Sequence, residues 1–362
     1  MSAPEIDVLI PVYNAASTLD AAVASMAGQT ISDIRILVVD DGSTDETPGL
    51  LAAWAARDVR VHVLRKANGG IVEALNYGLA QCAAEFVARF DADDIAYPQR
   101  LRVQLDFLRA HPEHAAVGCD VDHIDEQGAP IEGLPRPGSP ESSDPLWFPA
   151  REPYLIHPYV MMRRAAVMAV GGYRPSPNSE DSDLYWRLEE RGRLHNLPER
   201  LGQYRMHGSS ISGASIVNGR VMAVGSQLSA LSAARRRSGR ADFAFAATDA
   251  AALKSAGCLA AMIEVVAGRL DAVELRRLRL AASIKLLELA HYRPFEIEVQ
   301  DATFIRAALA HSEMATPENR GHIRWHVTQT SARLIRKGRL REALTLAPPG
   351  FLPRVAARAL LG

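Results

Sequence analysis

Short apolar runs alternate with amphipathic stretches along residues 1–111. Apolar runs bounded by turn-forming residues are typical of buried strands, and the amphipathic stretches between them are typical of helices. The expected strands are Ile6–Val12, Ile34–Val39, Val59–Leu64 and Phe86–Phe90, and the expected helices span 18–26, 50–56, 71–82 and 98–110. This repeated order of strand and helix predicts an α/β fold with a mostly parallel sheet and right-handed crossovers.

The pattern changes after residue 121. Residues 130–153 are rich in Pro and Gly, as in long loops that form lids or binding surfaces. Two short strands and one helix are expected next, at Val160–Arg163, Leu194–Leu197 and Asp183–Arg191. From about residue 214 the pattern is helical. We therefore expect two domains, an α/β domain over 1–213 and an all-helical region over 214–362.

Charge differs between these two parts, although the whole chain of 362 residues has a net charge of −1. The net charge is −11 for residues 1–213 and +10 for residues 214–362. The acidic part suits a divalent cation and argues against nucleic acid as a partner. The basic part could face an anionic membrane, an acidic polymer or the acidic part itself. Its last segment, Phe351–Leu361, could lie on a membrane surface, pack on the core or mediate dimerisation.

Cysteine usage and hydropathy bear on the compartment. Cys82, Cys119 and Cys258 are odd in number and far apart, which argues against a disulfide framework and fits a reducing cytosol. The first residues lack the basic and apolar regions of a secretory signal, and no stretch has about 18 uninterrupted apolar residues. We expect a cytoplasmic protein with, at most, peripheral contact at the inner face of the membrane.

Three carboxylates, Asp91, Asp93 and Asp94, directly follow the expected strand Phe86–Phe90. A buried parallel strand would deliver them to the carboxyl edge of the sheet, where open α/β folds bind ligands. Carboxylates this close repel one another unless a cation or water screens them. Oxygen ligands without nearby Cys or His favour Mg²⁺ or Mn²⁺, which often share substrate phosphates. The alternative is a solvated turn whose acids cap the next helix.

Three further features are expected at the same edge of the sheet. They are Pro11-Val12-Tyr13-Asn14 after the first strand, Asp41 after the second, and Asn68-Gly69-Gly70 after the third, with Asn76 in the following helix. They could offer a ring to a planar base, a carboxylate to a base or ribose, and a backbone that approaches a ligand closely. Each alone is also compatible with a turn, a helix cap or a flexible loop, but together they favour a ligand site.

These motifs, in this order, resemble those of glycosyltransferase family 2. The segments are Ile10–Asn14, Val38–Asp45, Asn68–Gly70 and Asp91–Asp94, followed by His157–Arg163, Gly171–Tyr173 with Glu180-Asp181, and Tyr204–His207 with nearby serines. The resemblance covers residues 5–213. It implies a GT-A fold with a Rossmann-like nucleotide-binding half, a nucleotide-diphosphate sugar donor and inversion at the anomeric centre.

The resemblance also implies roles for individual residues. Asp93 would be the closest ligand of a Mn²⁺ or Mg²⁺ cofactor, Asp91 would help to hold the ion or the ribose, and Asp94 is a further candidate ligand. Asp41 would contact the base. The implied nucleotide-sugar site also includes Pro11, Tyr13, Asn14, Asn68, Gly69, Asn76 and Ala92, with Arg205 or His207 near the diphosphate. His207 alone could equally be a surface residue.

Inversion in one step needs a carboxylate that takes the proton of the acceptor hydroxyl. The resemblance points to Asp181, with Glu180 as the alternative, although both acids also suit the positive end of a helix. Such a base needs a partly buried setting, because an ordinary carboxylate is a weak base. The resemblance implies a UDP-sugar donor and a glycan, polysaccharide or glycoconjugate acceptor, including a lipid-linked one.

Two other functions compete with this interpretation. A catalytically silent scaffold that binds sugar nucleotides would carry the same motifs, although intact Asp93 and Asp181 argue against it. Asp91-Ala92-Asp93 also loosely resembles the Asp-x-Asp motif of haloacid-dehalogenase-type phosphotransferases. That motif follows the first strand of its domain, whereas here it follows the fourth.

Overall fold

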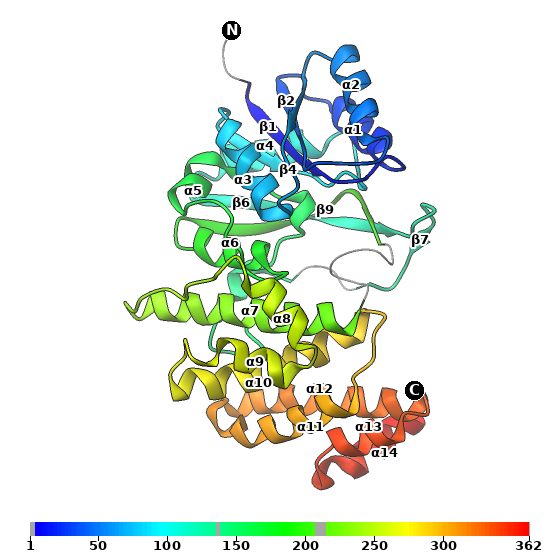
Figure 1. Cartoon of the computed structure of the whole chain (residues 1–362), viewed down its shortest axis with the longest axis vertical. Helices are drawn as coiled ribbons and strands as arrows, with labels where there is room; N and C mark the ends of the chain where they lie inside the picture. Colours follow the sequence, from blue (N-terminus) through cyan, green and yellow to red (C-terminus); the bar gives the residue numbers. More distant parts are fainter. Residues whose placement is uncertain (1–3, 135–137, 207–214, 362) are drawn as a thin grey trace. The chain divides into compact units, whose positions relative to one another are not determined.

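The computed structural model describes residues 4–134, 138–206 and 215–361, and the chain divides into two compact units (Figure 1). The first, termed the α/β unit, comprises Met1–Ser142, Pro153–Arg174 and Glu180–His207. The second, termed the helical unit, comprises Ser143–Glu152, Pro175–Ser179 and Gly208–Gly362. The helical unit therefore takes in two short segments that precede its helices in the sequence.

Four parallel strands begin the sheet of the α/β unit. They are β1 (Ile6–Val12), β2 (Ile34–Asp40), β3 (Val61–Arg65) and β4 (Phe86–Arg89), in the spatial order β3-β2-β1-β4. The helices between and after them are α1 (Leu19–Ala27), α2 (Thr47–Arg57), α3 (Ile71–Gln81) and α4 (Arg100–Ala110). In β1, Val8 and Ile10 belong to a core shared with α1, α2 and α4, whereas Leu9 belongs to a core shared with α3. Both faces of these strands are covered, which explains their uninterrupted apolar runs.

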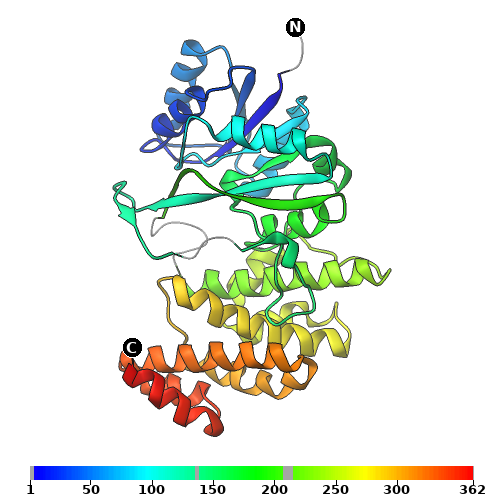
Figure 2. The same ribbon diagram turned by 180° about the vertical axis from the view of Figure 1, so that it is seen from behind.

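The sheet continues beyond β4 with strands of mixed direction. In spatial order these are β8 (Met161–Arg163), β6 (His114–Ile124), β9 (Arg193–Arg205) and β5 (Ile95–Ala96), with β7 (Pro130–Ile131) paired to β6. β8 is antiparallel to β4 and β6, whereas β6 and β9 run side by side in parallel (Figure 2). The α/β prediction is confirmed, and the strand expected at 194–197 is part of the longer β9.

Two helices and two short 3-10 segments complete the α/β unit. They are α5 (Arg164–Ala169), α6 (Glu180–Leu188), Pro140–Ser142 and His157–Tyr159. Helix α6 begins three residues before the expected start at Asp183, so that Glu180 and Asp181 lie in its first turn.

The helical unit has a hydrophobic core of its own, to which α7, α9, α10, α11 and α12 contribute. Its helices are α7 (Ile216–Arg237), α8 (Asp249–Ala256), α9 (Leu259–Ala267), α10 (Ala272–Tyr292), α11 (Val299–Ala308), α12 (Pro317–Arg336), α13 (Leu340–Leu346) and α14 (Leu352–Leu361), with 3-10 segments at Leu309–Met314 and Pro349–Phe351. The expected helical character is confirmed. Among the residues described, no helix combines the length and apolar character needed to cross a bilayer.

Candidate functional site

The loops that follow β1 and β2 are joined by Asn14. Its side-chain oxygen accepts a hydrogen bond from Thr44 N at 2.8 Å, and its backbone N donates to Ser43 Oγ at 3.0 Å. Asn14 adopts the left-handed backbone conformation with φ at 49°, which Asn tolerates better than most residues. Pro11 is buried in β1, whereas the neighbouring Tyr13 is 52% exposed and presents its ring to solvent.

Asp41 holds the glycine loop that follows β3. Its carboxylate is nearly buried and accepts hydrogen bonds from Lys66 Nζ at 2.7 Å, Gly69 N at 3.0 Å and Gly70 N at 2.8 Å. Asn68 Nδ2 donates to the backbone oxygen of Asp41 at 3.0 Å. The expected neighbours at this edge therefore do come together. Contact of Asp41, Asn68 or Gly69 with a nucleotide stays a prediction.

Asn76, on α3, binds a segment that sequence reasoning placed elsewhere in the site. Its side-chain oxygen accepts from Tyr173 N and its amide donates to Tyr173 O, both at 2.8 Å. The partner segment is tightly fitted, since a Cβ on Gly172 would lie 2.6 Å from Asn76 Oδ1. Asn76 thus positions the segment leading to α6, and its expected contact with the nucleotide stays a prediction.

The three acids that follow β4 lie close together in the structure as well as in the sequence. Carboxylate oxygens of Asp91, Asp93 and Asp94 lie within 4.8 Å of one another. Asp94 is 1% exposed, and its Oδ1 accepts from Arg205 N at 2.8 Å, whereas its Oδ2 is buried without a hydrogen-bond partner among the described residues. Burial, together with the charges of Asp91 and Asp93, raises the pKa of Asp94 well above its usual range. A divalent cation would offset both effects, so these oxygens fit Mg²⁺ or Mn²⁺.

Arg89 is a residue of this cluster that sequence reasoning missed. It lies 4% exposed at the end of β4, and its Nη2 is 2.5 Å from Asp91 Oδ1. Burial acts to lower the pKa of Arg89, but the charge and hydrogen bond of Asp91, together with Tyr173 and Tyr185, outweigh it and the pKa is raised. Arg100 Nη2 donates to the backbone oxygen of Arg89 at 2.7 Å. The sequence signal that could have identified Arg89 was a lone arginine inside an apolar strand, just before three acids.

Arg205 fastens the loop that carries the acids. Its Nε donates to Asp93 O at 2.9 Å, and its Nη1 donates to Asp125 O and Glu126 O at 3.0 and 3.1 Å. In the same loop, the backbone oxygen of Ala92 accepts from Thr18 Oγ1 at 2.9 Å. Direct contact of Arg205 or Ala92 with the diphosphate or sugar stays a prediction. The other candidate for the diphosphate, His207, lies outside the described residues.

Glu180 and Asp181 are half-buried in the first turn of α6. Burial and the neighbouring charge of Asp181 raise the pKa of Glu180 to about 7. The charges of Arg89 and Asp91 also act on Glu180, the first lowering and the second raising its pKa. Glu180 therefore lies within the electrostatic reach of the acid cluster and of its own neighbour Asp181. Asp181 Oδ1 accepts from Ser182 N at 2.7 Å.

The segment before α6 is held by buried polar contacts. Arg187 on α6 pairs with Asp183 at 2.6 Å, and its Nη1 donates to Val170 O and Gly172 O, each at 2.7 Å. The hydroxyl of Tyr173 lies 2.9 Å from His157 Nε2. Burial, aided by the charge of Arg89, holds the pKa of His157 well below its usual value, so its ring is neutral.

Comparison with known proteins places this arrangement in a family. A family profile described as Glycosyl transferase family 2 matches residues 7–171, so it ends before Glu180 and Asp181. The putative glycosyltransferase EpsE of Bacillus subtilis (strain 168) is 30% identical over 214 residues, which cover 56% of this chain and 74% of that protein. The amylovoran biosynthesis glycosyltransferase AmsE of Erwinia amylovora is 32% identical over 218 residues, covering 59% and 78%.

Solved structures show the same fold at low sequence identity. The mannosyltransferase PcManGT from Pyrobaculum calidifontis, in complex with GDP-Man and Mn²⁺, has a TM-score of 0.53 and 18% identity, covering 99% of this chain and 87% of that one. Residues 1–349 of S. aureus TarS, in complex with UDP-GlcNAc, give a TM-score of 0.51 and 17% identity, covering 92% of each chain. The fold is therefore of the GT-A type.

Proposed function

Since this chain belongs to glycosyltransferase family 2, we propose that it transfers a sugar from a nucleotide-diphosphate donor to a glycan acceptor, with inversion at the anomeric carbon. The observation that carries the proposal is the pairing of two acidic groups in one electrostatic environment. One is Asp91, Asp93 and Asp94 at the end of β4, and the other is Glu180 and Asp181 at the start of α6.

The first group would hold a divalent cation. Asp93 and Asp91 would be its ligands, and Asp94 would join them through the buried oxygen that has no hydrogen-bond partner among the described residues. The bound ion would neutralise charge on the leaving diphosphate as a Lewis acid. The Mn²⁺ and GDP-Man in PcManGT, a protein of the same fold, support this assignment.

The loops after β1, β2 and β3 would bind the nucleotide. The exposed ring of Tyr13 offers a surface on which a planar base can stack, and Pro11 in β1 and Asp41 beside the glycine loop would line the same pocket. Asn14 and Asn68 fix these loops to one another and so fix the shape of the pocket. Fixed loops reduce the ordering that binding requires. We propose a UDP-sugar as the donor.

The second group would act as the base. As the acceptor oxygen bonds to the anomeric carbon, its proton passes to Asp181 or Glu180 and the bond from that carbon to the diphosphate breaks. The pKa of about 7 for Glu180 suits proton transfer near neutral pH. Glu180 is therefore a stronger candidate for the base than the sequence, which favoured Asp181, had indicated. The acceptor we propose is a glycan, polysaccharide or glycoconjugate, in line with the name of AmsE.

Thermal unfolding with UDP, GDP and dTDP, each with and without Mn²⁺, tests donor binding. A ligand at about 100 times its Kd should add about 2.7 kcal/mol to the free energy of unfolding, or a few degrees in Tm. We expect the shift for one nucleotide only, and only with Mn²⁺. Asp93→Asn should lose it, whereas Asp106→Asn, which changes an exposed acid on α4, should keep it. A shift that survives Asp93→Asn contradicts the proposed metal site.

Release of nucleotide diphosphate during transfer separates an enzyme from a silent scaffold. Asp181→Asn and Glu180→Gln should keep the thermal shift, because neither residue is proposed to bind the nucleotide. At least one of them should abolish sugar transfer. Full transfer in both variants would rule out this pair as the base.

A further inference from the structure

The turn between α4 and β6 gathers side chains that bind transition metals. It consists of His111, Pro112, Glu113 and His114, and the backbone N of His114 donates to His111 O at 3.1 Å, which closes a β-turn. Proline at the second position fixes the turn further. Three of its four residues therefore present an imidazole or a carboxylate from a short, constrained piece of backbone.

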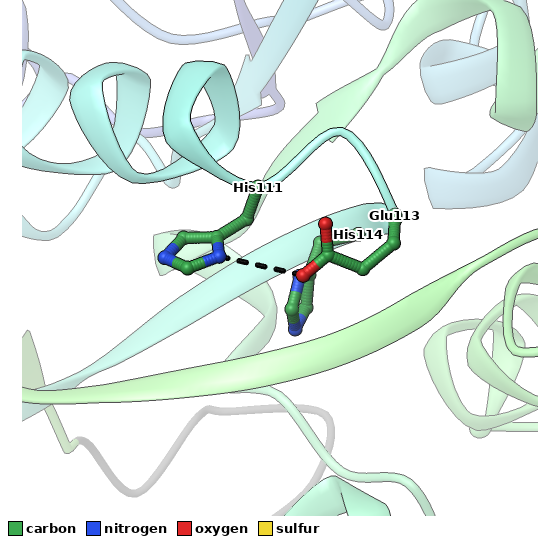
Figure 3. A group of neighbouring side chains, drawn as sticks. All are labelled: His111, Glu113 and His114. Atoms are coloured by element: carbon green, nitrogen blue, oxygen red, sulfur yellow. Dashed lines mark ion pairs between the residues drawn. The ribbon is translucent and has the colours of Figure 1, made fainter.

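The ligand atoms converge on one point (Figure 3). Glu113 Oε1 lies 3.3 Å from His111 Nδ1 and 3.2 Å from His114 Nδ1, and one ligand atom from each of the three residues lies within 4.8 Å of the other two. Ligands about 2.0–2.2 Å from a tetrahedral Zn²⁺ are about 3.3–3.5 Å apart. Both separations between the carboxylate and the imidazoles already match this spacing.

The backbone beneath these side chains is anchored. Glu113 O accepts from Arg193 N at 2.9 Å, and His114 O accepts from Arg163 Nε at 2.9 Å. Gly192, just before β9, packs closely against this backbone, since a Cβ there would lie 2.8 Å from Glu113 O. Ligands on a rigid backbone lose little freedom when an ion binds.

His114 also has an unused lone pair in the described structure. Its side chain is 7% exposed, and its Nδ1 is buried without a hydrogen bond to any described group, although Glu113 is near. A buried ring nitrogen without a hydrogen bond is costly unless a ligand satisfies it.

A second pair of groups adjoins the turn. His195 Nδ1, on β9, lies 3.5 Å from Glu141 Oε1, and one ligand atom of each lies within 4.8 Å of His114. The ring of Phe107 stacks on His195 with centroids 4.9 Å apart and also contacts His111. These neighbours form an outer shell that orients the rings of the turn.

We propose that this turn binds a Zn²⁺-class ion through His111, Glu113 and His114. Two imidazoles and one carboxylate favour zinc over magnesium, unlike the oxygen-only cluster of Asp91, Asp93 and Asp94. Strands β4 and β6 both run antiparallel to β8, so they point in the same direction. The turn precedes β6, whereas the acids follow β4. The two sites therefore lie at opposite ends of the strands. The ion would clamp the end of α4 to the start of β6.

The test uses the full chain without a polyhistidine tag, stripped with EDTA and titrated with Zn²⁺ against a chromophoric chelator. The variants are His111→Gln and Glu113→Gln, whose parent side chains are 46% and 48% exposed, so both should fold. The controls are His62→Gln, an exposed histidine on β3, and Asp93→Asn. Circular dichroism checks that each variant is folded.

We expect one tightly bound Zn²⁺ per chain, weakened about 100-fold or more in the two variants and unchanged in both controls. Co²⁺ in place of Zn²⁺ should give the visible absorption of tetrahedral coordination, and His111→Gln should remove it. Zn²⁺ binding that is absent, or equal in His111→Gln, overturns the proposal and leaves a contact of Glu113 with two histidines that binds no metal. Loss only in Asp93→Asn would assign the zinc to the acid cluster instead.

Discussion

Arg89 and Asp91 form an ion pair at the centre of the candidate site, and its electrostatic reach extends to Glu180. A buried arginine next to three carboxylates offsets part of their mutual repulsion before any cation binds. The same positive charge favours the ionised form of Glu180. The state of the proposed base is therefore set partly by a residue on a different element.

The pH dependence of transfer follows from the raised pKa of Glu180. If Glu180 is the base, its proton must leave before it can accept another, so kcat/KM should rise with pH and level off above about 7. Steady-state rates between about pH 5 and 9 measure this profile. In Glu180→Gln the step near pH 7 should vanish together with activity. A step that persists there, with activity lost only in Asp181→Asn, would assign the role to Asp181.

Arg89→Gln should shift the same profile. Removing the positive charge removes an effect that lowers the pKa of Glu180, so the pKa should rise and the profile should move to higher pH. Arg65→Gln is the matched control, because Arg65 pairs with Asp40 at the same edge of the sheet but is 63% exposed. An unchanged profile in Arg89→Gln would show that Arg89 does not set the pKa of the base.

The sequence predicted which residues of the site come together only where the strand pattern fixes the position of both. The loops that carry Asn14, Asp41 and the three acids follow strands of one sheet, so the strand pattern alone places them together. The partners of Asn76 and Arg205 lie 97 and 112 positions away in the chain, at Tyr173 and Asp93. No local pattern encodes such contacts, and both residues were expected at the ligand instead.

At the scale of elements, α6 is linked to α3 through the segment that precedes it in the chain. Asn76 on α3 and Arg187 on α6 both bind the segment Val170–Tyr173, and Gly172 there has φ at 67°. The sequence predicted the helix but placed its start at Asp183. Acidic residues at a helix start carry no apolar periodicity, so the pattern could not include Glu180 and Asp181.

Asn76→Ala tests the link between α3 and α6. The change removes two hydrogen bonds to buried backbone, and we expect a loss of about 1–3 kcal/mol in the free energy of unfolding. Activity should fall by up to about 100-fold, because α6 carries the proposed base and small displacements are costly. Urea unfolding and transfer assays measure both. Gln81→Ala, at an exposed position of the same helix, should change neither.

At the scale of the molecule, the chain has separate cores in its two units. The change of periodicity and charge near residue 214 predicts the helical region, but not that 143–152 and 175–179 are grouped with it. These segments lack helical periodicity, and their partners are distant. For example, Phe148 N donates to Asn319 Oδ1, 171 positions away.

Asp301→Asn should destabilise the helical unit. Arg220 is 2% exposed and pairs with the buried Asp301 at 2.6 Å and with the more exposed Glu298 at 2.5 Å. Removing the buried carboxylate leaves Glu298 as the remaining carboxylate of this cation, so the loss should approach, but not exceed, the cost of about 3–5 kcal/mol for breaking a buried pair. Glu264→Gln breaks the exposed pair with Arg279 and should cost at most about 1 kcal/mol. Calorimetry should show the loss in Asp301→Asn while the shift caused by nucleotide and Mn²⁺ persists. Equal stability of the two variants would contradict this account.

If Asp41 contacts the nucleobase as proposed, the hydrogen bonds that it already makes limit which base it can accept. A carboxylate has about four acceptor positions, and three are used by Lys66, Gly69 and Gly70. A base with a single N–H, such as uracil, can add to the fourth. A base that offers two donors side by side, such as guanine, must first displace a loop amide. The number of free acceptor positions on Asp41 would then decide which nucleotide binds, whichever sugar that nucleotide carries.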